Sequence, residues 1–280
     1  LDKDKQKNLL KIFEESNNNY VVKGDFLNAE KLIERILLNN NNNFNFKRNF
    51  SVNVGINRVR LDNKFFLSNF SGNLKFKNQN LSDGQLNGNF PNEKKMIFTV
   101  KTINKNKITT LYIDHAKPIV KNYKFIKGFD EGVLDFYSTK NGNISNSTLK
   151  IYDFKLKELP TLTKILTLAS LQGIADILSG EGIRFKEFEM NFKDIDDTIT
   201  ISEIYAIGPA ISILMDGYIE KNKLVSLRGT LVPATTINKV IGSIPILGKI
   251  LVGSKTGEGV FGVSFKIKGS PKNLETTVNP

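Results

Sequence analysis

Apolar and polar residues alternate along most of this chain with the period of β-strands. In FSVNVGI (50–56) every even-numbered residue is apolar and every odd-numbered residue is small or polar, so the pattern predicts a strand with one apolar face. The alternation changes phase before Val59 and Leu61, which predicts a bulge or a turn near Asn57. Similar stretches follow as far as residue 233, separated by short segments rich in Asn, Gly, Asp and Lys. This spacing favours a long antiparallel meander over an alternating strand-helix fold.

Helical periodicity interrupts the strands in three places, near residues 116–127, 160–179 and 237–251. The second segment has the strongest helical pattern, and Pro160 suits its first turn. Pro245 is expected to kink or split the third segment. The fold class expected from these elements is mainly β, with a few amphipathic helices.

We expect three regions along the chain. Residues 1–43 carry a short helix near 28–38 and an Asn-rich loop, and they look like the tail of a region further upstream. Residues 44–110 contain only strand-like stretches, whereas residues 111–280 combine strands with the three helical segments. The strand blocks repeat loosely, which fits a solenoid-like stack of units.

An antiparallel sheet with one apolar face has to cover that face with something. Three helices are few for so many strands. Either the sheet folds back into a closed β-sandwich, which is the more common solution, or it curls into a trough whose apolar lining holds a ligand. A lining of Phe, Ile, Val and Leu with few convergent polar groups would suit acyl chains better than a polar metabolite.

A glycine-rich stretch near the C-terminus raises the question of nucleotide binding. GEGVFG (257–262) has the spacing G-x-G-x-x-G, and GKILVGSKT (248–256) nearly spells a phosphate loop. Both motifs need a strand before the glycines and a helix after them, so that helix amides face the phosphate. Here the helical segment comes first and the alternating strand FGVSFKIKG follows. We therefore expect a turn and no nucleotide site, with turn residues Pro245, Gly248, Gly257, Gly259 and Gly262.

The composition argues against several chemistries. The 280 residues include no Cys and a single His, His115, which excludes disulfides, thiolate sites and multi-histidine metal sites. A catalytic pairing of His115 with Asp114 is unfavourable because adjacent strand residues point to opposite faces. Asp194, Asp196 and Asp197 lack the 12-residue pattern of a calcium loop, so a turn is expected there. We expect neither an enzyme nor a cofactor.

The formal net charge of +12 would suit an anionic partner. The lysines are nevertheless spread along the chain and are not gathered beside stacking aromatic residues, so nucleic acid is not an expected partner. An enzyme that cleaves polysaccharides would need clustered carboxylates, and no such pair is evident.

The C-terminal part of the chain resembles the AsmA-like C-terminal domain family of bacterial cell-envelope proteins. The resemblance covers about residues 110–280, and residues 44–110 share only its general texture. The segments that carry it are LKIYDFKL (149–156), LTKILTLASLQGIADILSGEGIRF (162–185), IYAIGPAISILMDGYIE (204–220), LRGTLVP (227–233), INKVIGSIPILGKIL (237–251), GEGVFGVSFKIKGSPKN (257–273) and VNP (278–280), with a loose match at IDHAKP (113–118).

This resemblance implies an elongated, curved, taco-shaped β-sheet groove with a hydrophobic interior. It also implies a place in the periplasm or cell envelope, with an inner-membrane anchor upstream of Leu1. Larger members look like bridges that carry phospholipids towards the outer membrane. The expected function is therefore phospholipid binding and passive transport along the groove. The alternative is a non-enzymatic structural or interaction module that supports outer-membrane assembly.

Two sets of candidate residues follow from this reading. The expected lining of acyl chains is Phe50, Val52, Val54, Ile211, Ile213, Phe261, Val263, Phe265 and Ile267. Helix residues expected to contact a membrane surface, to close the groove end or to be buried under the sheet are Leu162, Ile165, Leu166, Ile237, Val240, Ile241, Ile244, Leu247 and Ile250.

Overall fold

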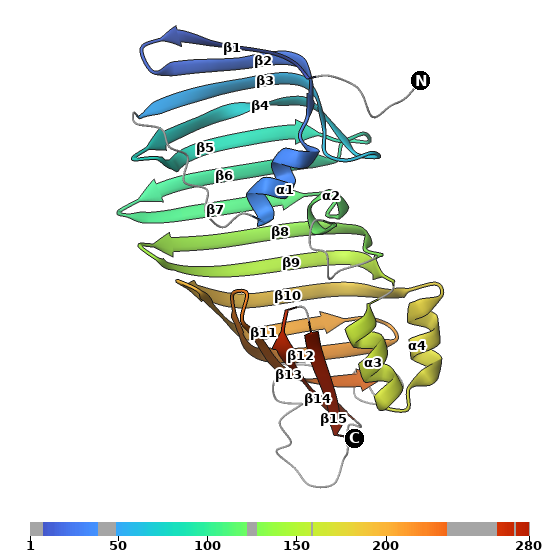
Figure 1. Ribbon diagram of the computed structural model, residues 1–280. Helices are drawn as coiled ribbons and strands as arrows, with labels where there is room; N and C mark the ends of the chain where they lie inside the picture. Colours follow the sequence, from blue (N-terminus) through green and yellow to red (C-terminus); the bar gives the residue numbers. More distant parts are fainter. Residues whose placement is uncertain are drawn as a thin grey trace, which may run out of the picture. The chain divides into compact units, whose positions relative to one another are not determined.

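The computed structural model describes residues 8–38, 49–121, 128–157, 159–233, 262–271 and 273–279. Within these ranges the chain is mainly β, and fifteen strands form one sheet in sequence order from β1 to β15 (Figure 1). The sheet stays open, with β1 and β15 as its two edge strands. The expected mainly β fold, an antiparallel meander with few helices, is confirmed. The chain divides into two compact units, and each is described by itself.

Unit 1 comprises Leu1–Tyr123 and Val133–Gly142. Neighbouring strands in it are antiparallel except for β2 and β3, which are parallel. A parallel pair needs a crossover connection, and α1 lies in that connection. The elements are β1 (Leu9–Ser16), β2 (Asn19–Asn28), α1 (Glu30–Leu38), β3 (Phe50–Arg60), β4 (Phe66–Lys77), β5 (Asn80–Asn89), β6 (Lys95–Ile103), β7 (Asn106–Ile113), α2 (Lys117–Val120) and β8 (Asp130–Asn141).

The strands and the two units do not follow the expected region boundaries. Residues 9–28, for which no strands are expected from the sequence, form β1 and β2 of the sheet. Their alternation is masked in the sequence by adjacent apolar residues such as Val21 and Val22 and by the charged residues of β1. The expected boundary at 110/111 falls inside β7, and the two units part mainly after Gly142.

The bulge or turn predicted near Asn57 is wrong, because β3 runs unbroken from Phe50 to Arg60 and its pairing with β4 has no register shift. Ile56 pairs with Phe70 and Arg58 pairs with Ser68, but Asn57 has no register partner between them. Opposite it, Asn69 has a positive φ of 50°. The register is the same on both sides of Asn57, and the register shift in this region lies instead in the β4–β5 pairing, between Ser68 and Ser71.

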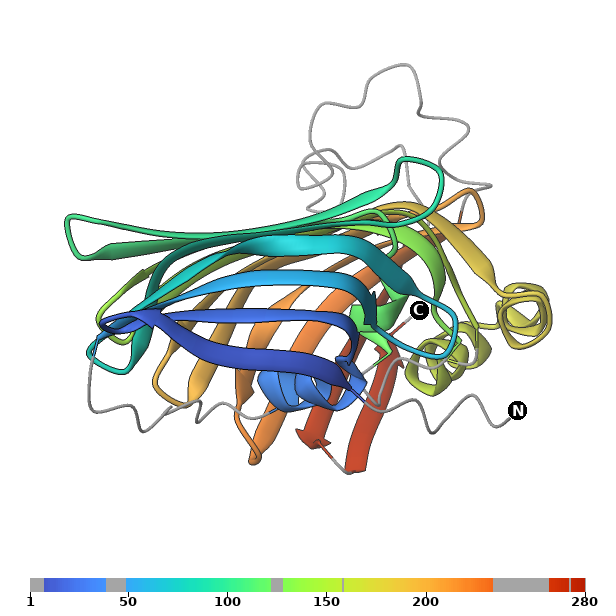
Figure 2. The ribbon, with the colours of Figure 1, turned by 90° about the horizontal axis from the view of Figure 1, so that it is seen from above.

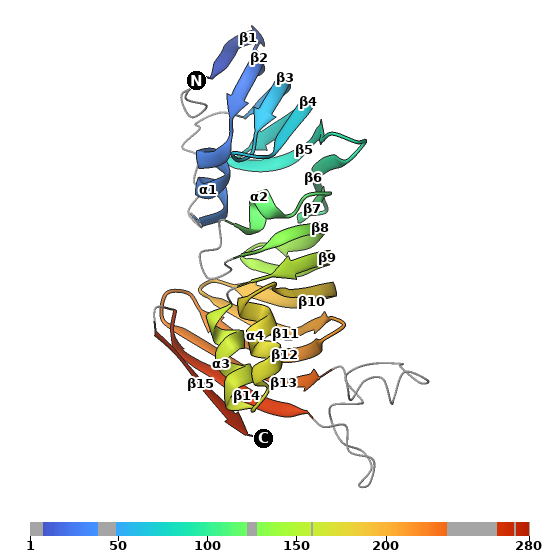
Figure 3. The ribbon, with the colours of Figure 1, turned by 90° about the vertical axis from the view of Figure 1, so that its right-hand side faces the viewer.

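Unit 2 comprises Lys124–Gly132 and Asn143–Pro280, and all its neighbouring strands are antiparallel. Helix α3 contacts β15, and it lies beside the last strands of the sheet (Figure 3). The elements are β9 (Ile144–Leu156), α3 (Pro160–Leu168), α4 (Gln172–Ser179), β10 (Ile183–Ile195), β11 (Thr198–Ile207), β12 (Ile211–Glu220), β13 (Leu224–Pro233), β14 (Val263–Ser270) and β15 (Asn273–Asn279).

The predicted helix at 160–179 consists of two helices. Ser170 has a positive φ of 58°, and the N–H of Leu171 donates to the carbonyl of Leu166 at 2.8 Å. This arrangement satisfies a carbonyl at the end of α3 and turns the chain before α4 begins. The predicted helix near 116–127 begins as α2, and residues 122–127 lie outside the described ranges. The predicted helix at 237–251 also lies outside them.

Candidate functional site

A continuous apolar row crosses all eight strands of unit 1. At one level of the sheet each strand places an apolar residue or a glycine directly opposite its neighbour, and directly paired residues share one face. We call these residues the central row: Ile12, Val22, Val54, Gly72, Leu86, Phe98, Leu111 and Phe136. Neighbouring strands lie about 4.8 Å apart. Seven such intervals make the central row about 34 Å long.

The central row is open to solvent. Ile12 is 69% exposed, and the other seven residues are half-buried. One row nearer to α1 and α2, by contrast, Ile56, Ile113 and Leu134 are buried, with exposures of 3%, 0% and 4%. Large contiguous apolar patches are rare on monomer surfaces, and they mark places where a ligand, a membrane or a partner is bound.

Helices α1 and α2 cover one end of this face. Figure 2 shows the strands of unit 1 bending around the side on which both helices lie. The ammonium of Lys121, just after α2, lies 2.9 Å from a carboxylate oxygen of Glu30 in α1 and 3.3 Å from one of Asp62. The buried Asp62 also accepts the backbone N–H groups of Lys64 and Phe65, both at 2.8 Å. These bonds tie both helices to the β3–β4 connection.

The opposite face of unit 1 is mostly polar, although it also carries Phe13, Val21, Ile97, Ile103 and Ile108. Thr99 and Thr110 share a hydrogen bond of 2.7 Å between adjacent strands, and the Asn73 amide donates to Asn53 at 2.8 Å. The hydroxyl of Tyr112 donates to Asp114 at 2.7 Å; this bond, followed by burial and nearby carboxylates, raises the pKa of Tyr112 to about 12. The sheet of unit 1 is thus amphipathic, with one mostly polar face and one apolar face.

In unit 2 the corresponding alternation ends in a closed core. Ile211, Leu231 and Val263 have no exposed surface, and Phe265 and Ile267 are 3% and 7% exposed. Leu231 pairs directly with Ile213 on one side and with Val263 on the other. Helix α3 packs nearby against β15, so protein covers most of the apolar face at this end of unit 2.

The structure separates the predicted lining residues into three groups. Phe50, Val52, Val54 and Ile213 are half-buried, and of these only Val54 belongs to the central row. Ile211, Val263, Phe265 and Ile267 are buried in the closed core of unit 2. Phe261 lies outside the described residues.

Only some of the predicted helix residues and turn residues lie in the described part of the chain. Leu162, Ile165 and Leu166 are buried on the inner side of α3, with exposures of 4%, 2% and 0%. Gly262 directly precedes β14, which confirms the predicted strand after the glycine turn. The residues outside the described ranges are Ile237, Val240, Ile241, Ile244, Pro245, Leu247, Gly248, Ile250, Gly257 and Gly259.

Four half-buried apolar residues of the central row were not among the residues predicted from the sequence to line a groove. Leu86, Phe98, Leu111 and Phe136 all lie in the central row. Each of them sits in an alternating stretch, so the signal for an apolar strand face was present. The sequence carried no signal for exposure, because the burial of a strand face depends on which other segments cover it.

The polar candidates from the sequence have structural partners. The His115 ring centroid lies 4.8 Å from those of Phe65 and Phe90; burial and then nearby Lys94 lower the pKa of His115. The carboxylate of Asp114 instead accepts the Tyr112 hydroxyl. Asp196 and Asp197 form the β10–β11 turn, and the Lys221 ammonium lies 3.0 Å from Asp194 near the end of β10. The described residues contain no cluster of His, Asp and Glu suited to a metal ion.

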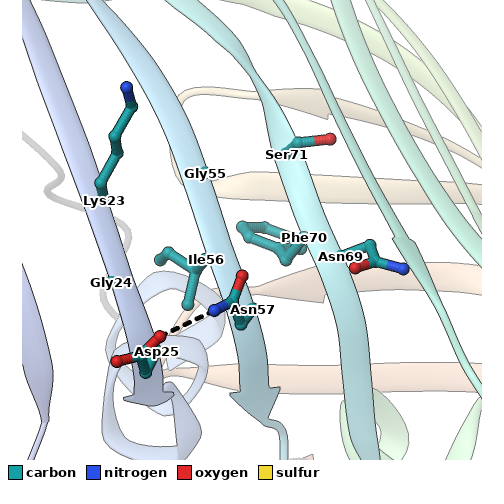
Figure 4. Close-up of a pocket in the computed structure, with 9 residues that line it drawn as sticks. All are labelled: Lys23, Gly24, Asp25, Gly55, Ile56, Asn57, Asn69, Phe70 and Ser71. Atoms are coloured by element: carbon teal, nitrogen blue, oxygen red, sulfur yellow. Dashed lines mark hydrogen bonds between the residues drawn. The ribbon is translucent and has the colours of Figure 1, made fainter.

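A shallow depression lies over β2, β3 and β4, where the strands bend (Figure 4). The Asn57 amide donates to Asp25 at 2.7 Å across it. Its lining is mostly polar or glycine and consists of Lys23, Gly24, Asp25, Gly55, Ile56, Asn57, Asn69, Phe70 and Ser71. The depression is shallow, and among its lining residues the Asn57–Asp25 bond is the one side-chain hydrogen bond. We therefore assign no binding site to it.

Comparison with protein-family models, with curated proteins and with solved structures gave no match. Among the described residues, no helix combines the length and the apolar character needed to span a bilayer.

Proposed function

We propose that this protein binds phospholipids through their acyl chains and lets them move passively along the apolar face of unit 1. The observation that carries the proposal is the central row, which is apolar or glycine on eight successive strands and open to solvent. A ligand for this face has to be long, flexible and apolar. Acyl chains meet all three requirements.

The dimensions and energies support this ligand class. The hydrocarbon core of a bilayer is about 30 Å thick, so the chains of one leaflet span about 15 Å. The central row, at about 34 Å, is longer than one such chain. Each methylene moved from water to an apolar surface gains about 0.8 kcal/mol, and a chain lying across several strands gains several times that amount. The mostly polar opposite face keeps the rest of the sheet in water.

Movement along the row needs no chemical step. Its members present similar apolar surfaces from strand to strand, with few polar groups to hold a chain at one position, so the free energy of a bound chain changes little along the row. We further propose the cell envelope as the site of action, with an anchor upstream of Leu1, because residues 110–280 resemble AsmA-like envelope proteins. The direction of net transport would follow the lipid gradient.

A second candidate function is a structural module for outer-membrane assembly that carries no lipid. The closed core of β12–β14 favours it locally, because Leu231 and Val263 are fully buried and offer no surface to a ligand. The two functions make different demands on unit 1. A scaffold needs no open apolar face there.

Lipid transfer between vesicles tests the proposal. The purified protein is incubated with donor vesicles that contain a fluorescent phospholipid and a quencher, and with unlabelled acceptor vesicles. Transfer proportional to protein concentration, together with phospholipid identified by mass spectrometry of the purified protein, is the expected result. Absence of both bound lipid and transfer would overturn the proposal and leave the scaffold function.

A further inference from the structure

The apolar face of unit 1 changes chemistry in register on two adjacent strands, β7 and β8. On β6, β7 and β8 the central row consists of Phe98, Leu111 and Phe136. Two residues further along each strand, the next row on the same face is Val100, Thr109 and Ser138. The row after that is Thr102, Lys107 and Lys140. On β7 and β8 the face therefore passes from apolar, through hydroxyl-bearing, to cationic side chains. On β6 the corresponding residues are the buried Val100 and the uncharged Thr102.

Lys107 and Lys140 are an unfavourable pair unless an anion joins them. They are directly opposite each other on β7 and β8, and like charges in that position destabilise a sheet. Neither ammonium makes an ion pair with a carboxylate in the described part of the chain. Burial, and then the charge of Lys140, lower the pKa of Lys107.

We propose that Lys107 and Lys140 bind the phosphate of an anionic glycerophospholipid whose acyl chains lie on the central row. This inference rests on the proposed lipid-binding function and assigns the lipid class and its orientation. Lys107 is four residues from Leu111, which is about 13 Å along a strand. The hydroxyl row lies between them, where the glycerol and ester groups of such a lipid would lie.

The order of the rows distinguishes a lipid from a free anion. A soluble phosphate ester would use only the two ammonium groups and would gain nothing from Phe98 or Leu111. A lipid uses all three rows at once, because its own polarity changes in the same order. The order of these side chains therefore complements an amphiphile that carries a phosphate. Its headgroup would lie at Lys107 and Lys140, and its acyl chains would lie towards the middle of the sheet.

The test compares two lipids with identical acyl chains, phosphatidylglycerol and diacylglycerol, in a fluorescence binding titration. The wild-type protein is expected to bind phosphatidylglycerol about tenfold more tightly, a preference of the size expected for one or two charge-assisted contacts. The double variant Lys107→Gln/Lys140→Gln should lose this preference and bind diacylglycerol as before. The matched control, Lys75→Gln/Lys101→Gln, removes the same charge from exposed positions on the opposite face and should keep the preference.

A second variant separates binding from folding. Lys140→Glu should pair with Lys107, leave the protein folded and at least as resistant to urea, and abolish the preference for phosphatidylglycerol. An unchanged preference for phosphatidylglycerol in both Lys107→Gln/Lys140→Gln and Lys140→Glu would overturn the headgroup site while leaving acyl-chain binding intact. Failure of the wild-type protein to bind either lipid would overturn the proposed function as well. Competition by glycerol 3-phosphate as strong as that by the lipid would show a site for free phosphate and refute the lipid assignment.

Discussion

Phe136 and Tyr137 are consecutive aromatic residues on β8 whose side chains lie on opposite faces of the sheet. Phe136 closes the central row and pairs directly with Leu111. Tyr137 pairs with Thr110 on the polar face and is 46% exposed. Changing each of them to Asp introduces the same charge at the same height of the sheet. The pair of variants therefore isolates the effect of the face.

Phe136→Asp should weaken phospholipid binding strongly. A chain that crosses this position loses apolar contact for about three methylenes, which at about 0.8 kcal/mol each is about 2.4 kcal/mol. Since about 1.4 kcal/mol corresponds to a tenfold change, the expected loss of affinity is about fiftyfold. Desolvation of the new carboxylate by the lipid would add to this loss. Tyr137→Asp should change affinity less than twofold.

The assay is a titration of each variant with a fluorescent phospholipid, accompanied by circular dichroism and urea unfolding. Phe136 is only half-buried, so its replacement should cost less than the roughly 3–5 kcal/mol typical of fully buried phenylalanines. Both variants should therefore remain folded. Equal affinities for Phe136→Asp and Tyr137→Asp, with both proteins folded, would refute the assignment of the apolar face as the lipid-binding surface.

Two further predictions concern the rest of the molecule. Leu231→Ala should lower the free energy of unfolding by about 2–5 kcal/mol, because Leu231 is fully buried between Ile213 and Val263. Urea titrations measure this change, and a decrease below about 1 kcal/mol would contradict a closed core there. Asp114→Asn should lower the pKa of Tyr112 from about 12 towards the usual value near 10, followed by tyrosinate absorbance. Because folding raises this pKa, the Tyr112–Asp114 bond should stabilise the protein below pH 10 and lose its effect as the pH rises through about 12. If Tyr112 titrates at the same pH in the Asp114→Asn variant, Asp114 is not the cause of the raised pKa.

Much of the local structure follows from neighbouring residues in the sequence. The alternation at Val52 and Val54 predicts a strand with one apolar face, and β3 is that strand. The bulge or turn predicted near Asn57 from the change of phase is absent, because phase in the sequence does not fix the register between strands. The break after α3 was missed because Leu171 and the residues beyond it continue the helical pattern across Ser170. That break depends on the positive φ of Ser170, which apolar spacing does not encode.

The sequence by itself determined most of the strands after Phe50, their apolar faces and the absence of cysteine chemistry, because each of these is a property of residue type and spacing along the chain. It could not distinguish the apolar strand residues Val263 and Phe98, since both alternate with polar neighbours in the same way. Only the tertiary structure decided that Val263 is fully buried while Phe98 stays half-exposed. The physical reason is that exposure depends on which distant segments pack over a face. The same is true of Lys107 and Lys140, which are far apart in sequence and become a charged pair only through the register of β7 and β8.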